Sequence, residues 1–270
     1  CIHAAGGLAS TYERFAKALP AGIPVFGIQS RIWHTDQGEW ESLDRMAESY
    51  ADSLARHSPA GPIRLFGFCM GGYLCMSVAR KLEARGAKVA VVAMVNSRLE
   101  PLADAERGLS LLPNYIMDVY NTFSRELGLI EAVEADALKK EIGDLCEKAL
   151  PAEAGDRSRL LVEWLLKRAR KEFVESGTVR QLMERFVVLF SRHIEMSHAY
   201  RPEPVRAPLV LWKGCNPFPG EDAAGLSWRE FTSGEYKEYD VGCNHFEMMF
   251  PPHVETLAAR LDSLLRAWET

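Results

Sequence analysis

The sequence predicts an α/β protein whose mostly parallel, doubly wound sheet carries an inserted helical segment. Short apolar runs alternate with helix-length segments along most of the 270 residues, which is the pattern of β-α-β units. The runs are rich in β-branched residues and do not alternate apolar with polar positions, as is typical of parallel strands covered on both faces. One long central stretch contains helical patterns only, so we expect one domain with an insertion.

Four apolar runs are expected to be strands, because each is short and continuously apolar. They span 23–28, 62–68, 89–95 and 208–212, and the segment 236–241 is also strand-like. Helices are expected between and after them, where apolar residues recur at helical spacing. These helices span 12–19, 43–56, 72–84 and 254–268. The closing helix shows this spacing well, with Val254, Leu257, Leu261 and Leu264 on one face.

The stretch from about 98 to 206 contains no strand-like run, only helical patterns such as NYIMDVYNTFSREL and VRQLMERFVVLFSRHIEM. An irregular loop of this length would be unusual in a compact domain. Prolines flank the stretch on both sides. We therefore expect an α/β core over 1–97 and 207–270, with a helical lid over about 98–206.

Composition excludes several classes of function. The net charge of −5 and the isoelectric point near 5.9 argue against a general nucleic-acid binder. No apolar run approaches the roughly 20 residues that span a membrane. The six cysteines show no CxxC spacing, so reduced thiols and a cytoplasmic location are expected. The chain opens inside an apparent strand end without an initiating methionine, and we expect it to be a piece of a longer protein.

The run GFCMG, at 67–71, follows an expected strand and precedes an expected helix. It fits the G-x-S-x-G nucleophile elbow, with Cys69 in place of serine, in the strand–turn–helix context that this motif requires. Small residues allow the strained turn, and the helix N-terminus favours a thiolate and a developing oxyanion. The alternative is an inert, buried cysteine in a glycine-rich turn.

A histidine base is expected in the loop after the last strand, where VGCNHFEMM supplies His245. The alternative is an ordinary loop histidine. His193 and His198 fall within the expected lid and are five residues apart, so they lie on different sides of a helix and do not resemble a zinc-binding pair. We therefore expect no metal site.

A third residue is needed to orient the histidine. Asn96 ends the strand at 89–95, where no acid is present, and an amide oxygen can accept a hydrogen bond from imidazole. The less favoured rival is Asp222 in KGCNPFPGED, with Glu221 beside it and Asn216 nearer the strand. In the alternative readings, Asn96 caps a turn and Asp222 is a solvated carboxylate.

The opening CIHAAGG supplies a glycine-rich loop after an early strand. Such a loop can aim a backbone N–H at a tetrahedral oxyanion, with the N–H after the nucleophile as its partner. Ala5 and Met70 are therefore the expected oxyanion-hole residues. The glycine pair alone is also consistent with a simple turn.

Together, IHAAGG, GFCMGG, VVAMVNS, VGCNHFEMM and the helical insertion resemble the thioesterase domain that terminates nonribosomal peptide and polyketide synthetases. The resemblance covers nearly the whole chain and implies an α/β-hydrolase fold for a single, monomeric domain over 1–270. It implies no bound cofactor, and a substrate delivered on the 4′-phosphopantetheine of an upstream peptidyl carrier protein domain. The sequence departs from the family at Cys69, usually serine, and at Asn96, usually aspartate.

The resemblance implies that an acyl or peptidyl chain moves onto Cys69 and is then released by water or an internal nucleophile. Cys69 is similar to the nucleophile of the few family members that use cysteine, including those that form β-lactone or β-lactam rings. Alternatives are a free-standing editing thioesterase, another cysteine hydrolase, or an inactive hydrolase-fold binding module. The basic cluster Lys167, Arg168, Arg170 and Lys171 is either a carrier-docking site or a solvated helix face.

Overall fold

The computed structural model describes residues 1–33, 42–57, 61–97, 99, 112–174, 177–215 and 227–269. The chain divides into two compact units, one formed by Cys1–Pro101 with Ile194–Thr270 and the other by Leu102–His193. Each unit is described by itself below.

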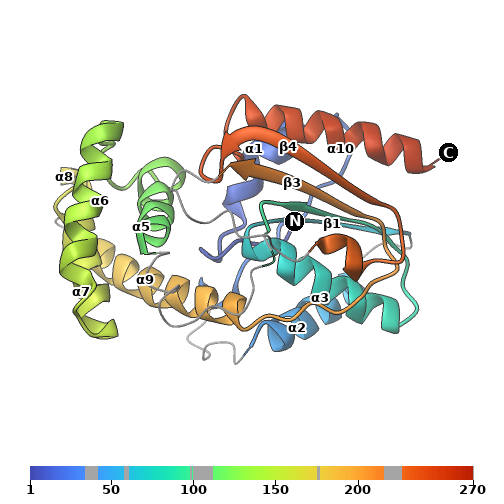
Figure 1. Ribbon diagram of the computed structural model, residues 1–270, viewed down its shortest axis with the longest axis horizontal. Helices are drawn as coiled ribbons and strands as arrows, with labels where there is room; N and C mark the ends of the chain where they lie inside the picture. The colour runs from blue at the N-terminus through green and yellow to red at the C-terminus, as the bar shows by residue number, and fades with distance from the viewer. Residues whose placement is uncertain are drawn as a thin grey trace. The chain divides into compact units, whose positions relative to one another are not determined.

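The first unit is built on a parallel sheet with the strand order β1-β2-β3-β4 (Figure 1). Its strands are β1 (Ile63–Phe68), β2 (Val89–Val95), β3 (Leu209–Cys215) and β4 (Tyr236–Asn244). In register, Phe68 lies opposite Val95, Val95 opposite Trp212, and Cys215 opposite Asn244. Because all four strands run the same way, the residues that follow them gather at one edge of the sheet. This edge receives Cys69, Asn96 and His245.

Helices cover both faces of this sheet (Figure 1). The helices α2 (Leu43–His57) and α3 (Met70–Ala84) pack together, and α3 contacts β1 and β2. On the other face, α1 (Glu13–Ala18) packs against α10 (His253–Glu269). The central strand β2 is almost wholly buried, as expected for a continuously apolar run with helices on both sides. The apolar stripe of α10 lies in the same buried cluster as Phe66 and Trp212.

The expected strand at 23–28 is wrong. Only Ile28 forms a bridge, to Ile2, which is itself bridged to Gly67. The Ile28 N–H donates to the Cys1 carbonyl at 2.8 Å, and the Ile2 N–H donates to the Phe66 carbonyl at 3.0 Å. Pairing does not extend further because Pro24 has no N–H to donate, and the Phe26 side chain is 71% exposed. The segment therefore lies at the edge of the sheet and forms a single bridge, at Ile28.

The second unit is helical, as expected for the insertion. Its helices are α5 (Leu112–Asn121), α6 (Ala135–Ala149), α7 (Ala154–Leu166), α8 (Lys171–Val174) and most of α9 (Gly177–His198), with a π-helical turn at Thr122–Glu126. Phe123, Phe186 and Phe190 are buried and pack ring against ring. These aromatic side chains therefore form this unit's own core.

The basic cluster is not a uniform solvated face. Arg168 is largely buried, ion-paired with Glu141, and lies over the Trp164 ring at 4.1 Å from its centroid. The Arg170 guanidinium lies 3.7 Å from the Glu131 carboxylate. Arg168 therefore packs and pairs within the helical unit rather than presenting its charge to solvent.

Candidate active site

Cys69 occupies a strained turn between β1 and α3. Its backbone angles, φ 56° and ψ −124°, lie outside the regions that residues with a Cβ commonly adopt. Three hydrogen bonds hold it there: its N–H donates to the Val95 carbonyl at 2.8 Å, and its carbonyl accepts from Ser97 Oγ at 2.6 Å and from the Gly72 N–H at 3.1 Å. The conformation is that of a nucleophile elbow.

The glycines around Cys69 are required by close approach. A Cβ at Gly67 would lie 2.2 Å from the backbone C and O of Gly71, and one at Gly72 would lie 2.0 Å from Ser97 Oγ. A Cβ at Gly71 would lie 2.4 Å from the Ile2 carbonyl oxygen. These distances are far below van der Waals contact, so only glycine lets the end of β1, the start of α3 and the opening loop meet here.

Cys69 differs in its surroundings from three of the other cysteines. It is partly exposed and directly precedes the first residue of α3, where the positive end of the helix dipole faces developing negative charge. By contrast, burial raises the pKa of the Cys75 thiol to about 12 and that of the Cys146 and Cys243 thiols to about 11. Those three thiols stay protonated near neutral pH and are poor nucleophiles.

The structure brings Asn96 and His245 together. Asn96 Nδ2 lies 2.7 Å from His245 Nδ1, and the imidazole stacks on the ring of Phe68, the residue before Cys69, at a centroid distance of 4.6 Å. Asn96 has φ 48°, a left-handed conformation that asparagine tolerates. Its side-chain Oδ1 accepts a hydrogen bond from the Gly214 N–H at 3.0 Å. Asn96 therefore contacts the ring that stacks beside the elbow.

The rival orienting residue, Asp222, lies outside the described residues, as do Asn216 and Glu221. The predicted oxyanion-hole residues Ala5 and Met70 are both buried. Met70 is the first residue of α3, and its N–H has no acceptor within the helix. Ala5 lies in a turn closed by a hydrogen bond from the Gly7 N–H to the Ala4 carbonyl at 2.9 Å.

Two buried side chains that sequence reasoning missed hold the opening loop. His3 Nε2 lies 2.7 Å from the Tyr50 hydroxyl, and its Nδ1 donates to the Ala4 carbonyl at 2.8 Å. The Tyr12 hydroxyl donates to the Ile2 carbonyl at 2.5 Å and accepts from the Phe68 N–H at 2.9 Å. Tyr12 thus links the start of the chain to the end of β1, directly before Cys69.

Behind the elbow, Ser97 is fully buried, and its carbonyl accepts a hydrogen bond from Trp228 Nε1 at 2.6 Å. Ser97 was assigned no role from the sequence, although it directly follows Asn96. Gly214 and Trp228 carry no sequence signal for this role, because their contacts depend on how β3 and the segment after it pack against β2.

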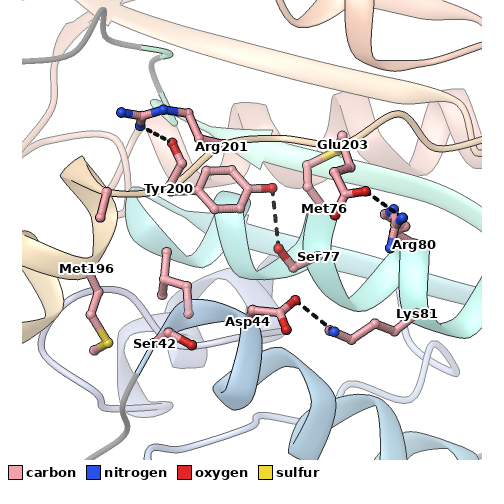
Figure 2. A pocket seen from close by; sticks show the side chains of 12 residues that line it. Ser42, Asp44, Met76, Ser77, Arg80, Lys81, Met196, Tyr200, Arg201 and Glu203 are labelled. Atoms are coloured by element: carbon pink, nitrogen blue, oxygen red, sulfur yellow. Dashed lines mark hydrogen bonds and ion pairs between the residues drawn. The ribbon is translucent and has the colours of Figure 1, made fainter.

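A cavity of about 280 Å³ lies between α2, α3 and the segment 196–203 (Figure 2). Four of its charged lining residues form ion pairs: Arg80 with Glu203 at 2.5 Å, and Lys81 with Asp44 at 2.7 Å. None of the residues around the elbow lines this cavity. It is a separate hollow, and its fifth charged lining residue, Arg201, donates hydrogen bonds to the His198 and Tyr200 carbonyls.

The described part of the chain contains no cluster of three or more His, Cys, Asp or Glu residues that would hold a metal ion. Nor does any described helix combine the length and the apolar character that a membrane crossing requires. What the elbow offers is a thiol, an imidazole and backbone N–H groups, which together suit acyl transfer.

A family model described as a thioesterase domain matches residues 1–148, more than half of the chain. The chain belongs to the thioesterase-domain family. This thioesterase domain is 22% identical, over 98% of its length, to a dimodular nonribosomal peptide synthase of Bacillus subtilis (strain 168), of which it covers 10%. It thus spans only a small part of that synthase.

Solved structures share the fold. A four-domain nonribosomal peptide synthetase bound to AMP and glycine aligns with a TM-score of 0.72 and 18% identity, over 97% of this chain and 19% of the other. The thioesterase domain that cyclises the lipopeptide antibiotic surfactin aligns with a TM-score of 0.58 and 19% identity, over 98% of this chain and 88% of the other. The expected α/β-hydrolase fold with a helical insertion is confirmed.

Proposed function

We propose that this thioesterase domain releases an acyl or peptidyl chain from the phosphopantetheine of a carrier protein through an acyl-S-Cys69 intermediate. The observation that carries the proposal is the position of Cys69 in a strained elbow at the N-terminus of α3, next to Phe68, on whose ring the His245 imidazole stacks. The likeness to a nonribosomal peptide synthase supports a peptidyl thioester as substrate and a carrier protein domain of a longer synthetase as partner.

In the first half-reaction, Cys69 Sγ attacks the thioester carbonyl. A Cys69 Sγ–C bond forms, the C–S bond to pantetheine breaks, and the proton lost by Cys69 ends on the pantetheine sulfur. The backbone N–H groups of Ala5 and Met70 stabilise the oxyanion. Because one thioester replaces another, the acyl group stays as activated as it was on the carrier.

In the second half-reaction, water or a nucleophile within the chain attacks the acyl carbon. The C–S bond to Cys69 breaks, and the proton lost by the nucleophile returns to Sγ. His245 orients the attacking group, and Asn96 positions His245. Cyclic release is supported by the likeness to the surfactin-cyclising domain. A thioester intermediate also suits a strained product such as a β-lactam or β-lactone, because a thiolate leaves more readily than an alkoxide.

The proposal is tested by mixing the domain with peptidyl-pantetheine thioesters and measuring the released products by mass. A linear acid indicates hydrolysis, and a product lighter by one water indicates cyclisation. We expect release by the wild type and none by Cys69→Ala, with Cys75→Ala as the matched cysteine control. No release from pantetheine or carrier-bound thioesters would refute the proposal and favour a non-catalytic binding module.

A further inference from the structure

The side-chain amide of Asn96 has a defined orientation. The Gly214 backbone N–H is a hydrogen-bond donor and lies 3.0 Å from Oδ1. A rotation of the amide by half a turn would place the NH₂ group against this N–H and set two donors face to face. The Gly214 N–H therefore fixes Oδ1 on its own side and directs Nδ2 to His245.

This orientation determines where His245 carries its proton. Asn96 Nδ2 lies 2.7 Å from His245 Nδ1, and an amide NH₂ can only donate. Nδ1 must therefore accept and carry no proton. A neutral imidazole has a single N–H, which is then on Nε2, the nitrogen on the opposite side of the ring. An aspartate in place of Asn96 would accept from Nδ1–H and give the reverse tautomer.

We infer that Gly214 and Asn96 together hold His245 in its Nε2–H tautomer and so limit its ability to act as a general base. This inference rests on the proposed function, because it concerns the release of the acyl group from Cys69. With Nε2 already protonated, His245 cannot take a proton from an attacking water at that nitrogen. A proton on both nitrogens would place Nδ1–H against the Asn96 NH₂, which is also unfavourable.

The restraint affects the two half-reactions unequally. Thiols ionise partly near neutral pH, whereas water does not, so loading of a thiol nucleophile needs a base less than hydrolysis does. An amine within the bound chain attacks in its neutral form without a base. The new C–N bond forms, the C–S bond to Cys69 breaks, and the ammonium proton of the intermediate moves to Sγ. The arrangement therefore favours chains with an internal amino nucleophile over release by water.

The tautomer is measured directly by long-range ¹H–¹⁵N spectroscopy of the whole chain labelled at the histidine nitrogens. His245→Gln removes one ring's signals and so assigns them among the seven histidines. We expect a pyridine-type Nδ1 and a pyrrole-type Nε2 in the wild type, and the reverse in Asn96→Asp. A pyrrole-type Nδ1 in the wild type would overturn the inference, whether or not Asn96→Asp folds.

The second arm measures hydrolysis of preformed acyl-Cys69 by intact mass. In Asn96→Asp, whose carboxylate can accept from both Gly214 and Nδ1–H, we expect hydrolysis to rise roughly a hundredfold, the lower part of what a positioned base contributes. Unchanged hydrolysis together with a switched tautomer would contradict the restraint. Failure of any acyl adduct to form would refute the proposed function instead, while the spectrum would still decide the tautomer.

Discussion

Gly67→Ala tests the packing that creates the elbow. The new Cβ would lie 2.2 Å from the backbone C and O of Gly71 and 2.6 Å from the Gly72 N. Carbon contacts normally lie at about 3.5–4.0 Å, so the end of β1 and the first turn of α3 must separate by more than about 1 Å. Both neighbours are backbone and have no flexible side chain to move aside.

Overpacking of this kind lowers the free energy of unfolding by about 1–3 kcal/mol. Because the neighbours of the new Cβ are rigid backbone, we expect a loss of about 3 kcal/mol for Gly67→Ala. For a chain of this size, about 2 °C is lost per kcal/mol, so the midpoint of thermal unfolding should fall by roughly 6 °C. The same displacement should slow acylation of Cys69 at least roughly tenfold. Circular dichroism during heating and intact mass during acylation measure the two effects.

Gly143→Ala is the matched control for this change. A Cβ at Gly143 has nothing within 4 Å, and the position lies inside α6, where alanine is favoured by about 0.5–1 kcal/mol. We expect unfolding at or slightly above the wild-type temperature and unchanged acylation. If Gly67→Ala behaved like this control, the close approach of β1 and α3 would not be present.

Three further results are expected. Ser97→Ala removes the Oγ–H bond to the Cys69 carbonyl and should lower the free energy of unfolding by about 1 kcal/mol while slowing acylation; equal rates would contradict its supporting role. Tyr12→Phe leaves the partly buried Phe68 N–H without its acceptor and should lower the free energy of unfolding in urea by about 1 kcal/mol; an unchanged value would show that this hydrogen bond does not stabilise the elbow. At pH 8, iodoacetamide should label Cys69 well before Cys75. Burial raises the pKa of the Cys75 thiol to about 12, so that thiol stays protonated at pH 8. Equal labelling rates in peptide mapping would refute this order.

The central strands and the elbow could be predicted because their causes are local. The apolar run of β2 and the G-x-C-x-G turn before α3 each determine their own structure through burial and close packing. The sequence of segment 23–28 looks equally strand-like, but whether it forms a strand depends on whether a neighbouring strand is available to pair with it. In the structure its one bridge is to Ile2, in the short opening segment of the chain, and no local pattern indicates that.

The contact between Asn96 and His245 could be anticipated, because both follow strands that end at the same sheet edge. Which atom of the Asn96 amide faces the imidazole could not be anticipated. We expected the amide oxygen to face the imidazole, whereas the structure directs that oxygen to the Gly214 N–H. A glycine backbone N–H has no side-chain signature, and its position depends on how β3 lies beside β2.

The measurement that tests the account most directly is the intact mass of the domain after brief exposure to a peptidyl-pantetheine thioester, followed by neutral hydroxylamine. The account predicts an adduct of the acyl mass that maps to Cys69, is absent in Cys69→Ala, and is cleaved rapidly as a thioester, whereas any Cys69→Ser adduct resists cleavage as an oxoester. An adduct that persists in Cys69→Ala, or release that proceeds at the wild-type rate in that variant, would contradict a covalent role for Cys69.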